Sequence, residues 1–341
     1  MHWNYSMRAL LQVADTGPLE SLAVMLRSAG IEPCLPSRQL RDQLRDWGCD
    51  TVLEIDSLVK GWGYDRPFAM RELSDFNDAD LIVDIKAHRN GPIITRKLPR
   101  FEGRILWYRI NGGQPEHVPG HGDEVNPGCP ILTPNQWYTG RSDAYVCWPP
   151  FYRIDEYYDE LGRSPVDKPI CLIHNLHGWG YQALSDNMRK LGVRCYGLRS
   201  PDGMIRHSEV AKALSRALCV VHLKSNDAPG YALYEALAAR CPVVCTRRLI
   251  WRCKMQELFV PNDTCLVFDR ETHDGLTDED VERCTEEVRE AILRLTDPSE
   301  NERIGTAGYR RLMQIMWNEK QDNASLSAFM RRNFPWSASA S

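Results

Sequence analysis

The chain has 341 residues, which is enough for two domains of ordinary size, each with its own hydrophobic core. Hydrophobic residues make up 43% and charged residues 26%, and the net charge is −4, which excludes a disordered chain and argues against a surface that binds nucleic acid throughout. The 12 cysteines follow no zinc or disulfide spacing, and no apolar run reaches the roughly 18 residues of a membrane span, so we expect a cytoplasmic protein with free thiols.

The first half of the chain alternates strand-like and helix-like segments. Apolar residues at helical spacing predict a helix over 19–30, which ends at Gly30. Short apolar runs bounded by turn residues predict strands over 8–13, 80–85, 104–110, 130–133 and 144–148. We place the first domain at residues 1–158, and a polar stretch over 155–168 is the predicted interdomain linker.

The second half repeats the alternation, and we place the second domain at residues 166–309. Strands are predicted over 170–174, 193–197, 218–223 and 242–246. Helices are predicted over 182–191, 208–217, 228–240, 278–295 and 301–317. This pattern predicts an α/β fold of two Rossmann-like units with largely parallel sheets. Because such sheets bind ligands outside the carboxyl ends of their strands, two facing sheets would share a central cleft.

The segment over 222–246 carries the clearest chemical signal. A strand there ends in a polar loop that contains Lys224, Ser225, Asn226 and Asp227. Pro229 and Gly230 then open a helix, because proline suits the first helical turn and glycine lets a ligand approach the backbone. The N-terminus of a helix binds diphosphate through its free N–H groups, and Lys224 would add a positive charge. Glu235, roughly two turns further, suits the paired hydroxyls of a ribose.

This segment resembles the donor-binding element of the retaining GT-B glycosyltransferases, the group 1 glycosyl transferases. Their pattern is Glu, seven residues, Glu, an Ala-rich helix and then Gly-x-Pro-Val-Val. Here the spacing holds from Asp227 to Glu235, and the end reads Arg240-Cys-Pro-Val-Val244. The resemblance implies that Glu235 binds the ribose and that Asp227 contacts the donor sugar. Aspartate replaces the family's first glutamate and is one methylene shorter, which leaves the identity of the sugar open.

Other segments are similar to the same family. The run that ends at Gly17 lies where the family has a glycine loop after its first strand, and residues 147–155 look like the segment that closes its first domain. Residues 298–305 resemble the start of its C-terminal region, whose last helix crosses back, so we expect residues of about 310–336 to pack on the first domain. The family's Arg and Lys after the first strand of the second domain are missing from residues 174–181. Candidate replacements are Lys224, Arg199, Arg206, Arg247 and His177.

The resemblance implies transfer of a sugar from a nucleoside diphosphate sugar to a hydroxyl acceptor with retention of configuration. It implies neither a metal nor a cofactor besides this co-substrate. The residues expected at the reacting centre are Asp227, Lys224 and Arg199. The residues expected to bind the donor are Glu235, Gly230, Tyr231, Pro229, Ser225, His177 and Gly17. The residues expected on the acceptor side are Asn111, Gly112, Gly113 and His88.

Simpler interpretations compete with these roles. Asp227 and Glu235 also fit a helix cap followed by an exposed helical residue, and Gly17 and residues 111–113 also fit ordinary turns. The loop with His117 and His121 does not have the spacing of a helical zinc motif, so no metal site is predicted. A basic run comprises Lys86, His88, Arg89, Arg96, Lys97, Arg100 and Arg104. It fits either a solvated face or an anionic acceptor, such as a phosphorylated glycan or DNA with hydroxymethylated bases.

Two other functions stay open at this point. A nucleotide-sugar epimerase of the same fold would need acid and base groups near the sugar, which His174 and His177 would supply. A non-catalytic module that binds nucleotide sugars or nucleic acid is favoured by the missing Arg and Lys pair.

Overall fold

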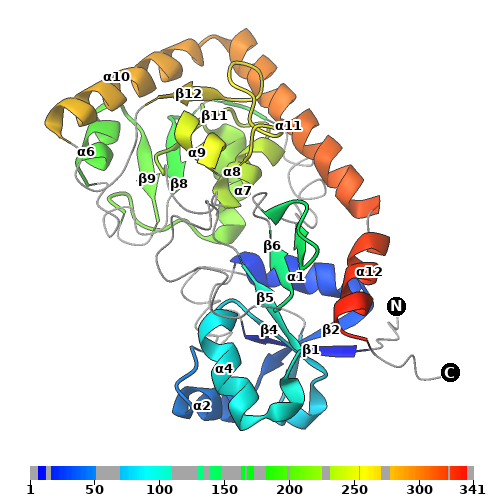
Figure 1. Ribbon diagram of the computed structural model, residues 1–341. Helices are drawn as coiled ribbons and strands as arrows, with labels where there is room; N and C mark the ends of the chain where they lie inside the picture. The colour runs from blue at the N-terminus through cyan, green and yellow to red at the C-terminus, as the bar shows by residue number, and fades with distance from the viewer. Residues whose placement is uncertain are drawn as a thin grey trace. The chain divides into compact units, whose positions relative to one another are not determined.

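The computed structural model describes residues 7–12, 17–50, 70–109, 129–133, 138–146, 163–165, 167–172, 182–197, 200–224, 231–252, 254–269, 277–321 and 323–335. The chain forms two compact units (Figure 1). The first unit comprises Met1–Gly61, Arg66–Tyr152 and Met316–Ser341, and the second comprises Trp62–Asp65 and Arg153–Ile315. None of the helices in the described ranges is long and apolar enough to cross a membrane.

A parallel sheet of seven strands forms the centre of the first unit, in the order β3-β2-β1-β4-β5-β6-β7. Its strands are β1 (Met7–Gln12), β2 (Ile31–Pro36), β3 (Arg71–Leu73), β4 (Leu81–Asp84), β5 (Ile105–Tyr108), β6 (Ile131–Thr133) and β7 (Ala144–Val146). Its other elements are α1 (Gly17–Ser28), α2 (Arg38–Asp46), α4 (Ala87–Lys97), α12 (Asn323–Asn333) and the short 3-10 helices η1 (Phe76–Asp78) and η2 (Pro99–Phe101). The strands are apolar on both faces because helices cover both faces.

Each face of this sheet has its own hydrophobic core. Leu11, Val83 and Leu106 face one cluster, which contains the apolar side chains of α1 and α12. The next residues back along β1 and β4, Leu10 and Ile82, face the opposite cluster with side chains from α2 and α4. This alternation follows from the period of two residues along a strand, and it assigns every strand residue to one of the two faces.

The last helix of the chain, α12, belongs to the core of the first unit. Its Leu326, Phe329 and Met330 are buried beside the strands of that unit. The ring of Phe329 lies 5.7 Å from that of Tyr145, and the Arg332 guanidinium donates to the carbonyl oxygen of Ser142 at 2.8 Å. The two ends of the chain therefore lie in the same unit.

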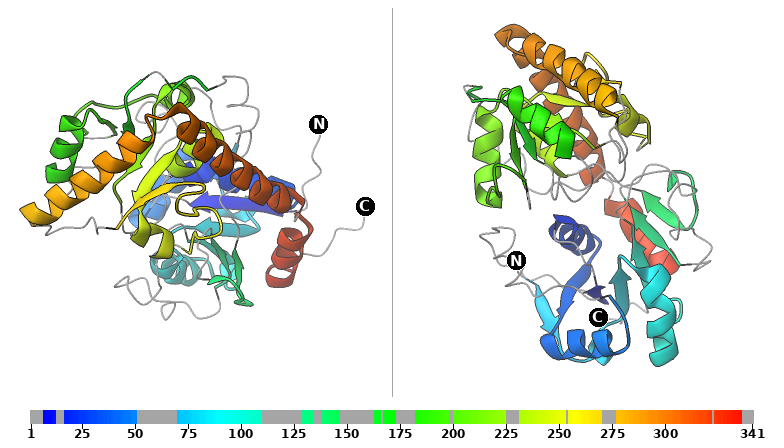
Figure 2. Two further views of the ribbon diagram at one scale, coloured as in Figure 1. Left: turned by 90° about the horizontal axis from the view of Figure 1, so that it is seen from above. Right: turned by 90° about the vertical axis from the view of Figure 1, so that its left-hand side faces the viewer.

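A parallel sheet of five strands forms the second unit, in the order β12-β11-β10-β8-β9. Its strands are β8 (Ile170–Leu172), β9 (Arg194–Tyr196), β10 (Val220–His222), β11 (Val243–Thr246) and β12 (Leu266–Phe268). Its helices are α6 (Gln182–Lys190), α7 (His207–Arg216), α8 (Tyr231–Ala238), α9 (Arg247–Arg252), α10 (Asp278–Arg294) and most of α11 (Pro298–Gln321). Helices α6 and α10 pack together over one face, where their apolar side chains meet Val221 and Val244 (Figure 2).

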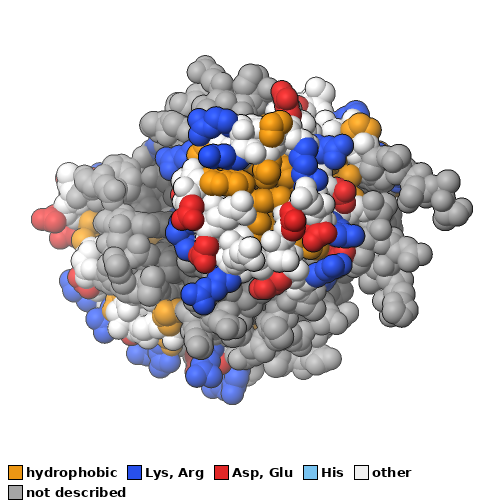
Figure 3. Space-filling model, turned by 90° about the horizontal axis from the view of Figure 1, so that it is seen from below, with side chains coloured by type: hydrophobic (Ala, Val, Ile, Leu, Met, Phe, Trp, Pro, Cys, Tyr) orange, Lys and Arg blue, Asp and Glu red, His pale blue; other side chains and the backbone are white. Residues whose placement is uncertain are grey.

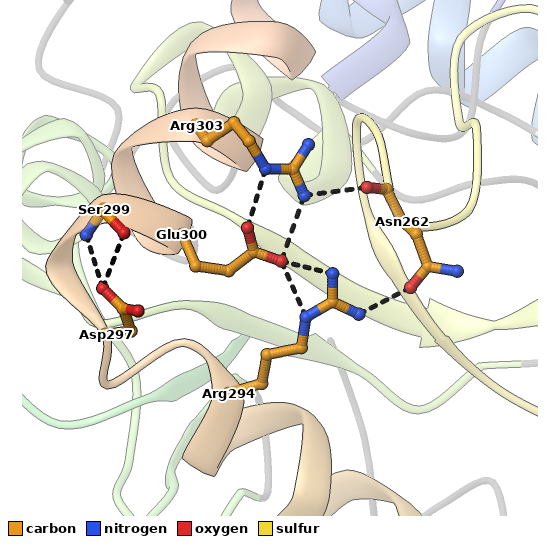
Figure 4. Close-up of polar contacts among 6 residues, drawn as sticks. All are labelled: Asn262, Arg294, Asp297, Ser299, Glu300 and Arg303. Carbon is orange, nitrogen blue, oxygen red and sulfur yellow. Dashed lines mark hydrogen bonds and ion pairs between the residues drawn. The ribbon is translucent and has the colours of Figure 1, made fainter.

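The start of α11 is fixed by a group of charged and polar side chains (Figure 4). The Glu300 carboxylate accepts hydrogen bonds from Arg294 Nε and Arg303 Nε, each at 2.7 Å. The two arginines also bind Asn262, Arg294 through the side-chain oxygen at 2.6 Å and Arg303 through the carbonyl oxygen at 2.9 Å. Asp297 lies before the first helical residue, and its carboxylate accepts from the backbone N–H of Ser299 at 2.8 Å. These contacts join α10, α11 and the turn before β12.

Arg163 also belongs to the second unit, although the sequence placed it in the linker. Its guanidinium donates to the carbonyl oxygens of Leu214, Ala217 and Leu218 and to Asn301 Oδ1, the last at 2.8 Å. The predicted linker therefore ends earlier than residue 168, because Arg163 satisfies the carbonyls at the end of α7.

Candidate functional site

The carboxyl edge of the second sheet has a reversal of strand order between β8 and β10. From β8 the chain continues to β9 on one side, and β10, β11 and β12 follow on the other side. In open parallel sheets, ligands bind in the crevice outside the carboxyl ends of the strands at such a reversal. The reversal therefore predicts a ligand site at the end of β10 and the start of the following helix.

The elements β10 and α8 hold the described residues of the predicted donor segment. Lys224 follows β10 by two positions and is partly exposed. Helix α8 contacts β10 and β11, and its Leu233, Tyr234, Ala236 and Leu237 are buried. Glu235 is the only charged residue in the α8 sequence, and it remains partly exposed. A single carboxylate thus stays accessible on a helix whose other side chains are largely packed.

His222, the last residue of β10, is a polar residue of this edge that the sequence reasoning did not select. It is 1% exposed, and neither ring nitrogen has a hydrogen-bond partner in the described parts of the chain. Burial, together with the positive charge of Lys224, lowers the pKa of His222 to about 3. The imidazole is therefore neutral at physiological pH, with one N–H to donate and one nitrogen to accept. Val221 faces the α10 side of the sheet, so His222 faces the other side. The only hint in the sequence was a histidine that ends an apolar strand.

Asp227, Arg199, Gly230, Pro229, Ser225, His177, Asn111, Gly112 and Gly113 lie outside the described residues. Tyr231 is the first residue of α8, and Gly17 is the first residue of α1. The structure thus holds Lys224 and Glu235 on one strand–helix unit, and the other roles remain predictions.

The structure separates His88 from the exposed part of the basic run. His88 is 5% exposed on α4, and its ring lies 5.6 Å from the ring of Trp107. Arg89, Arg96 and Lys97 are exposed on the same helix. Arg100 is engaged locally, because it donates to the carbonyl oxygens of Phe76 and Ala79. The run is therefore not one solvated face.

The described side chains on the face shown in Figure 3 carry both signs of charge. On the face shown in Figure 3, Lys and Arg side chains alternate with Asp and Glu around a hydrophobic patch. Within the residues that the structure describes, no three His, Cys, Asp or Glu side chains are placed to hold a metal ion. The ten cysteines in these ranges are all free thiols.

Comparison with known proteins agrees with this architecture. Residues 179–316 match the family model described as glycosyl transferase-like. No curated protein sequence matches the chain.

Several solved structures share the fold at low sequence identity. A glycosyltransferase from Rickettsia africae superposes with a TM-score of 0.60 at 10% identity, over 98% of this chain and 100% of that one. Sucrose-phosphate synthase from Thermosynechococcus elongatus superposes with a TM-score of 0.57 at 16% identity, over 96% of this chain and 98% of that one. An alpha-glucosyltransferase has been solved in complex with UDP and a 13-mer DNA containing an HMU base. It superposes with a TM-score of 0.56 at 12% identity, over 94% of this chain and 100% of that one. The chain spans 57% of the length of a mutant S. aureus TarM chain.

These likenesses confirm two predictions from the sequence. The fold is that of the GT-B glycosyltransferases, with two α/β units built on parallel sheets. The glycosyl transferase-like match covers the α8 segment on which the resemblance was based. The spacing from Asp227 to Glu235 stays a prediction, because Asp227 is not described.

Proposed function

We propose that this protein is a glycosyltransferase that moves a sugar from a nucleoside diphosphate sugar to a hydroxyl acceptor with retention of configuration. The proposal depends on one observation: Lys224 and Glu235 lie on the strand–helix unit of β10 and α8, beside the reversal of strand order. The match of residues 179–316 to the glycosyl transferase-like family supports it, because that match includes both residues.

In this proposal the diphosphate binds at the N-terminus of α8. The free N–H groups of the first turn and the partial positive charge of the helix favour an anion there. Lys224 adds a full positive charge, and the neutral His222 offers one N–H from the end of β10. Arg199 and His177 take the place of the family's missing Arg and Lys pair.

The rest of the donor is held by residues on or before α8. Glu235 accepts hydrogen bonds from the ribose hydroxyls, and Asp227 contacts the sugar. The proposal also assigns Ser225, Pro229, Gly230 and Tyr231 to donor binding, and it keeps Gly17 as a residue that would contact a phosphate.

The reaction needs charge stabilisation more than acid–base chemistry. The acceptor oxygen forms a bond to the anomeric carbon while the bond from that carbon to the diphosphate oxygen breaks. The acceptor proton passes to the departing diphosphate oxygen, so no protein base has to take it. Fixed N–H groups and Lys224 stabilise the negative charge that develops on the diphosphate.

For the acceptor we propose a glycan or a hydroxymethylated DNA base. An alpha-glucosyltransferase of the same fold has been solved with UDP and DNA containing an HMU base, which supports the second choice. The exposed Arg89, Arg96 and Lys97 on α4 are the basic groups in the first unit that would meet such a phosphate backbone. His88 is buried and would act on the acceptor only through its neighbours.

The test is thermal stability of the full chain against nucleoside diphosphates and their sugars. A nucleotide at a hundred times its dissociation constant should add about 2.7 kcal/mol to the free energy of unfolding. We expect Glu235→Ala to abolish the increase in melting temperature that a nucleoside gives and also the increase that the corresponding nucleoside diphosphate gives. Lys224→Ala should reduce only the increase given by the nucleoside diphosphate, because the nucleoside carries no phosphate for Lys224 to bind. Glu290→Ala, an exposed glutamate on α10, is the matched control and should leave both shifts intact.

Two results would contradict the proposal. If no nucleotide raises the melting temperature, the donor site is wrong. If nucleotides bind but neither transfer nor donor hydrolysis is detected with any acceptor, the chain is a binding module.

A further inference from the structure

The first unit has its own reversal of strand order, between β1 and β4. From β1 the chain adds β2 and β3 on one side, and β4 to β7 follow on the other. Gln12 is the last residue of β1, Asp84 is the last residue of β4, and the two are register partners across the reversal. Their side chains share one face of the sheet and are 1% and 0% exposed. Two polar groups thus meet at the position where parallel sheets bind ligands.

The Gln12 amide is fixed in orientation. Its Nε2 donates to the carbonyl oxygen of Asp50 at 2.5 Å, so Oε1 must face away as an acceptor. The amide of Asn90 holds the same backbone position: Nδ2 donates to Asp50 O and Oδ1 accepts from Asp50 N, both at 3.0 Å. The donor side of Gln12 is therefore occupied, and Oε1 has no hydrogen-bond partner among the residues that the structure describes.

The Asp84 carboxylate is satisfied on one oxygen. Its Oδ1 accepts from the backbone N–H of Lys86 at 2.7 Å, which turns the chain into α4. Its Oδ2 is buried and accepts no hydrogen bond of ordinary geometry in the described ranges, although the Asn90 side chain lies close enough to lower the pKa of Asp84. On the other side of Asp84 in the sheet, the register partner is Trp107, whose indole N–H donates to the carbonyl oxygen of Ile85 at 3.0 Å. The row across β1, β4 and β5 therefore presents two acceptor oxygens and an apolar ring.

A buried acceptor without a donor lowers the stability of a fold, and each one calls for an explanation. Two of them, on register partners at a reversal of strand order, have a common explanation in a ligand that brings donors. We propose that Gln12 Oε1 and Asp84 Oδ2 form a hydroxyl-binding site for a neutral polyol. The inference deepens the proposed function and rests on it in one respect: the polyol would be the sugar acceptor, which selects the glycan over the DNA base.

The chemistry of the pair selects the ligand class. A polyol carries adjacent O–H groups, and one O–H can donate to each of the two oxygens. A phosphate or carboxylate presents acceptor oxygens and negative charge, which the Asp84 carboxylate would repel. Both protein oxygens are shielded from solvent, so above pH 7, where the Asp84 carboxyl has lost its own proton, the donor must be an ordered ligand hydroxyl or a single bound water. The test has to separate these two sources.

The closing experiment compares Asp84→Asn with Asp80→Asn in the full chain. Asp80 lies at the opposite end of β4, where its carboxylate accepts from the backbone N–H of Arg8 at 2.8 Å. The control is therefore the same substitution next to the same strand. The probes are methyl α-D-glucopyranoside, myo-inositol and inorganic phosphate, with the melting temperature as the measurement at about pH 8, where the Asp84 carboxyl is ionised.

We expect the neutral polyols to raise the melting temperature of the wild type and of Asp80→Asn, and phosphate to have no effect through this site. Asp84→Asn replaces a buried carboxylate by a neutral amide, so the unliganded variant should melt no lower than the wild type at pH 8. Its polyol affinity should fall by about tenfold, the loss expected for one hydrogen bond to a charged acceptor. In a transfer assay the acceptor KM should rise by the same factor, with the donor KM unchanged.

Three outcomes would overturn the inference. The first is that polyols do not raise the melting temperature of the wild type, and the second is that they raise the melting temperature of Asp84→Asn by as much as that of the wild type. The third is that unliganded Asp84→Asn melts at a lower temperature than the wild type while its polyol affinity is unchanged. The last would assign the pair to a structural water. Nucleotide shifts measured in parallel report on the second unit. If these are absent while the polyol shift depends on Asp84, the glycosyltransferase proposal fails and the hydroxyl site stands.

Discussion

Gly305 of α11 lies against the backbone of Arg240, the second residue after α8, so closely that a Cβ on Gly305 would stand 2.1 Å from the Arg240 carbonyl oxygen. One turn further, a Cβ on Gly308 would stand 2.7 Å from Leu237 Cδ2 of α8. Helix α11 therefore holds α8 in place through two glycines. Because α8 carries Glu235, the position of the candidate ribose ligand depends on this backbone contact.

Gly305→Ala should destabilise the second unit. In an open helix the change from glycine to alanine stabilises by roughly 1 kcal/mol, but here the added methyl group overlaps a carbonyl oxygen, and overpacking costs about 1–3 kcal/mol. Urea denaturation should show a lower midpoint. Arg310→Ala, on the exposed side of α11, should change the free energy of unfolding by less than about 0.5 kcal/mol. A stabilised Gly305→Ala protein would contradict the close contact.

Arg240 adopts a left-handed conformation, with φ of 55°, at the position where the resembling family has glycine. Its guanidinium lies 4.7 Å from the centre of the Tyr309 ring. Arg240→Ala removes the guanidinium and keeps the strain, whereas Arg240→Gly also relieves the strain. We expect the glycine variant to be about 1 kcal/mol more stable than the alanine variant. Equal stability of the two in chemical denaturation would mean that the backbone is not strained.

Glu300 makes the stability of the second unit depend on acid pH. Hydrogen bonds from Arg303 and Arg294 outweigh partial burial and lower the pKa of Glu300 from 4.5 to about 2. A lowered pKa adds stability that is present above pH 4.5 and is lost as the pH falls towards 2. Glu300→Gln should therefore cost about 1 kcal/mol at neutral pH, and this difference should shrink below pH 4.5. Glu290→Gln serves as the control, and an effect of Glu300→Gln that is independent of pH would contradict the ion-pair account.

Asp84 should give the first unit the opposite pH dependence. Burial raises the pKa of Asp84 from 3.8 to about 7, against the lowering effect of the Lys86 N–H and the Asn90 side chain. A raised pKa adds stability that is complete below pH 3.8 and is lost as the pH rises to 7, at up to about 1.4 kcal/mol per pH unit. Melting curves between pH 5 and 7 should show this decline, and Asp84→Asn should remove it.

The other groups around Asp84 do not produce that slope. Asp50 lies nearby and raises the pKa of Asp84, and the charge of Lys86 lowers it. Burial raises the pKa of Cys49 to about 11 and that of Cys129 to about 12, so neither thiol titrates in the same range. If Asp84→Asn keeps the slope of the wild type, another group is responsible.

The sequence predicted the strands that form continuous apolar runs, because a parallel sheet covered by helices requires them. It missed β2, where Pro33 and Pro36 suggest a turn, and α4, where Gly91 and Pro92 interrupt the helical pattern. In the folded chain β2 is held between β1 and β3, and α4 packs on β4 and β5. Tertiary contacts thus outweigh the local preferences of proline and glycine.

By itself the sequence determined the strands and helices with clear hydrophobic patterns, although it missed β2 and α4. It also determined the segment with Lys224 and Glu235, because these residues follow one another along a single strand, loop and helix. Only the tertiary structure decided that Gln12 meets Asp84, that His222 is buried as a neutral imidazole, and that Gly305 touches Arg240. The physical reason is that strand register, desolvation and backbone contact depend on segments far apart in the chain. A local pattern of residue types carries no information about them.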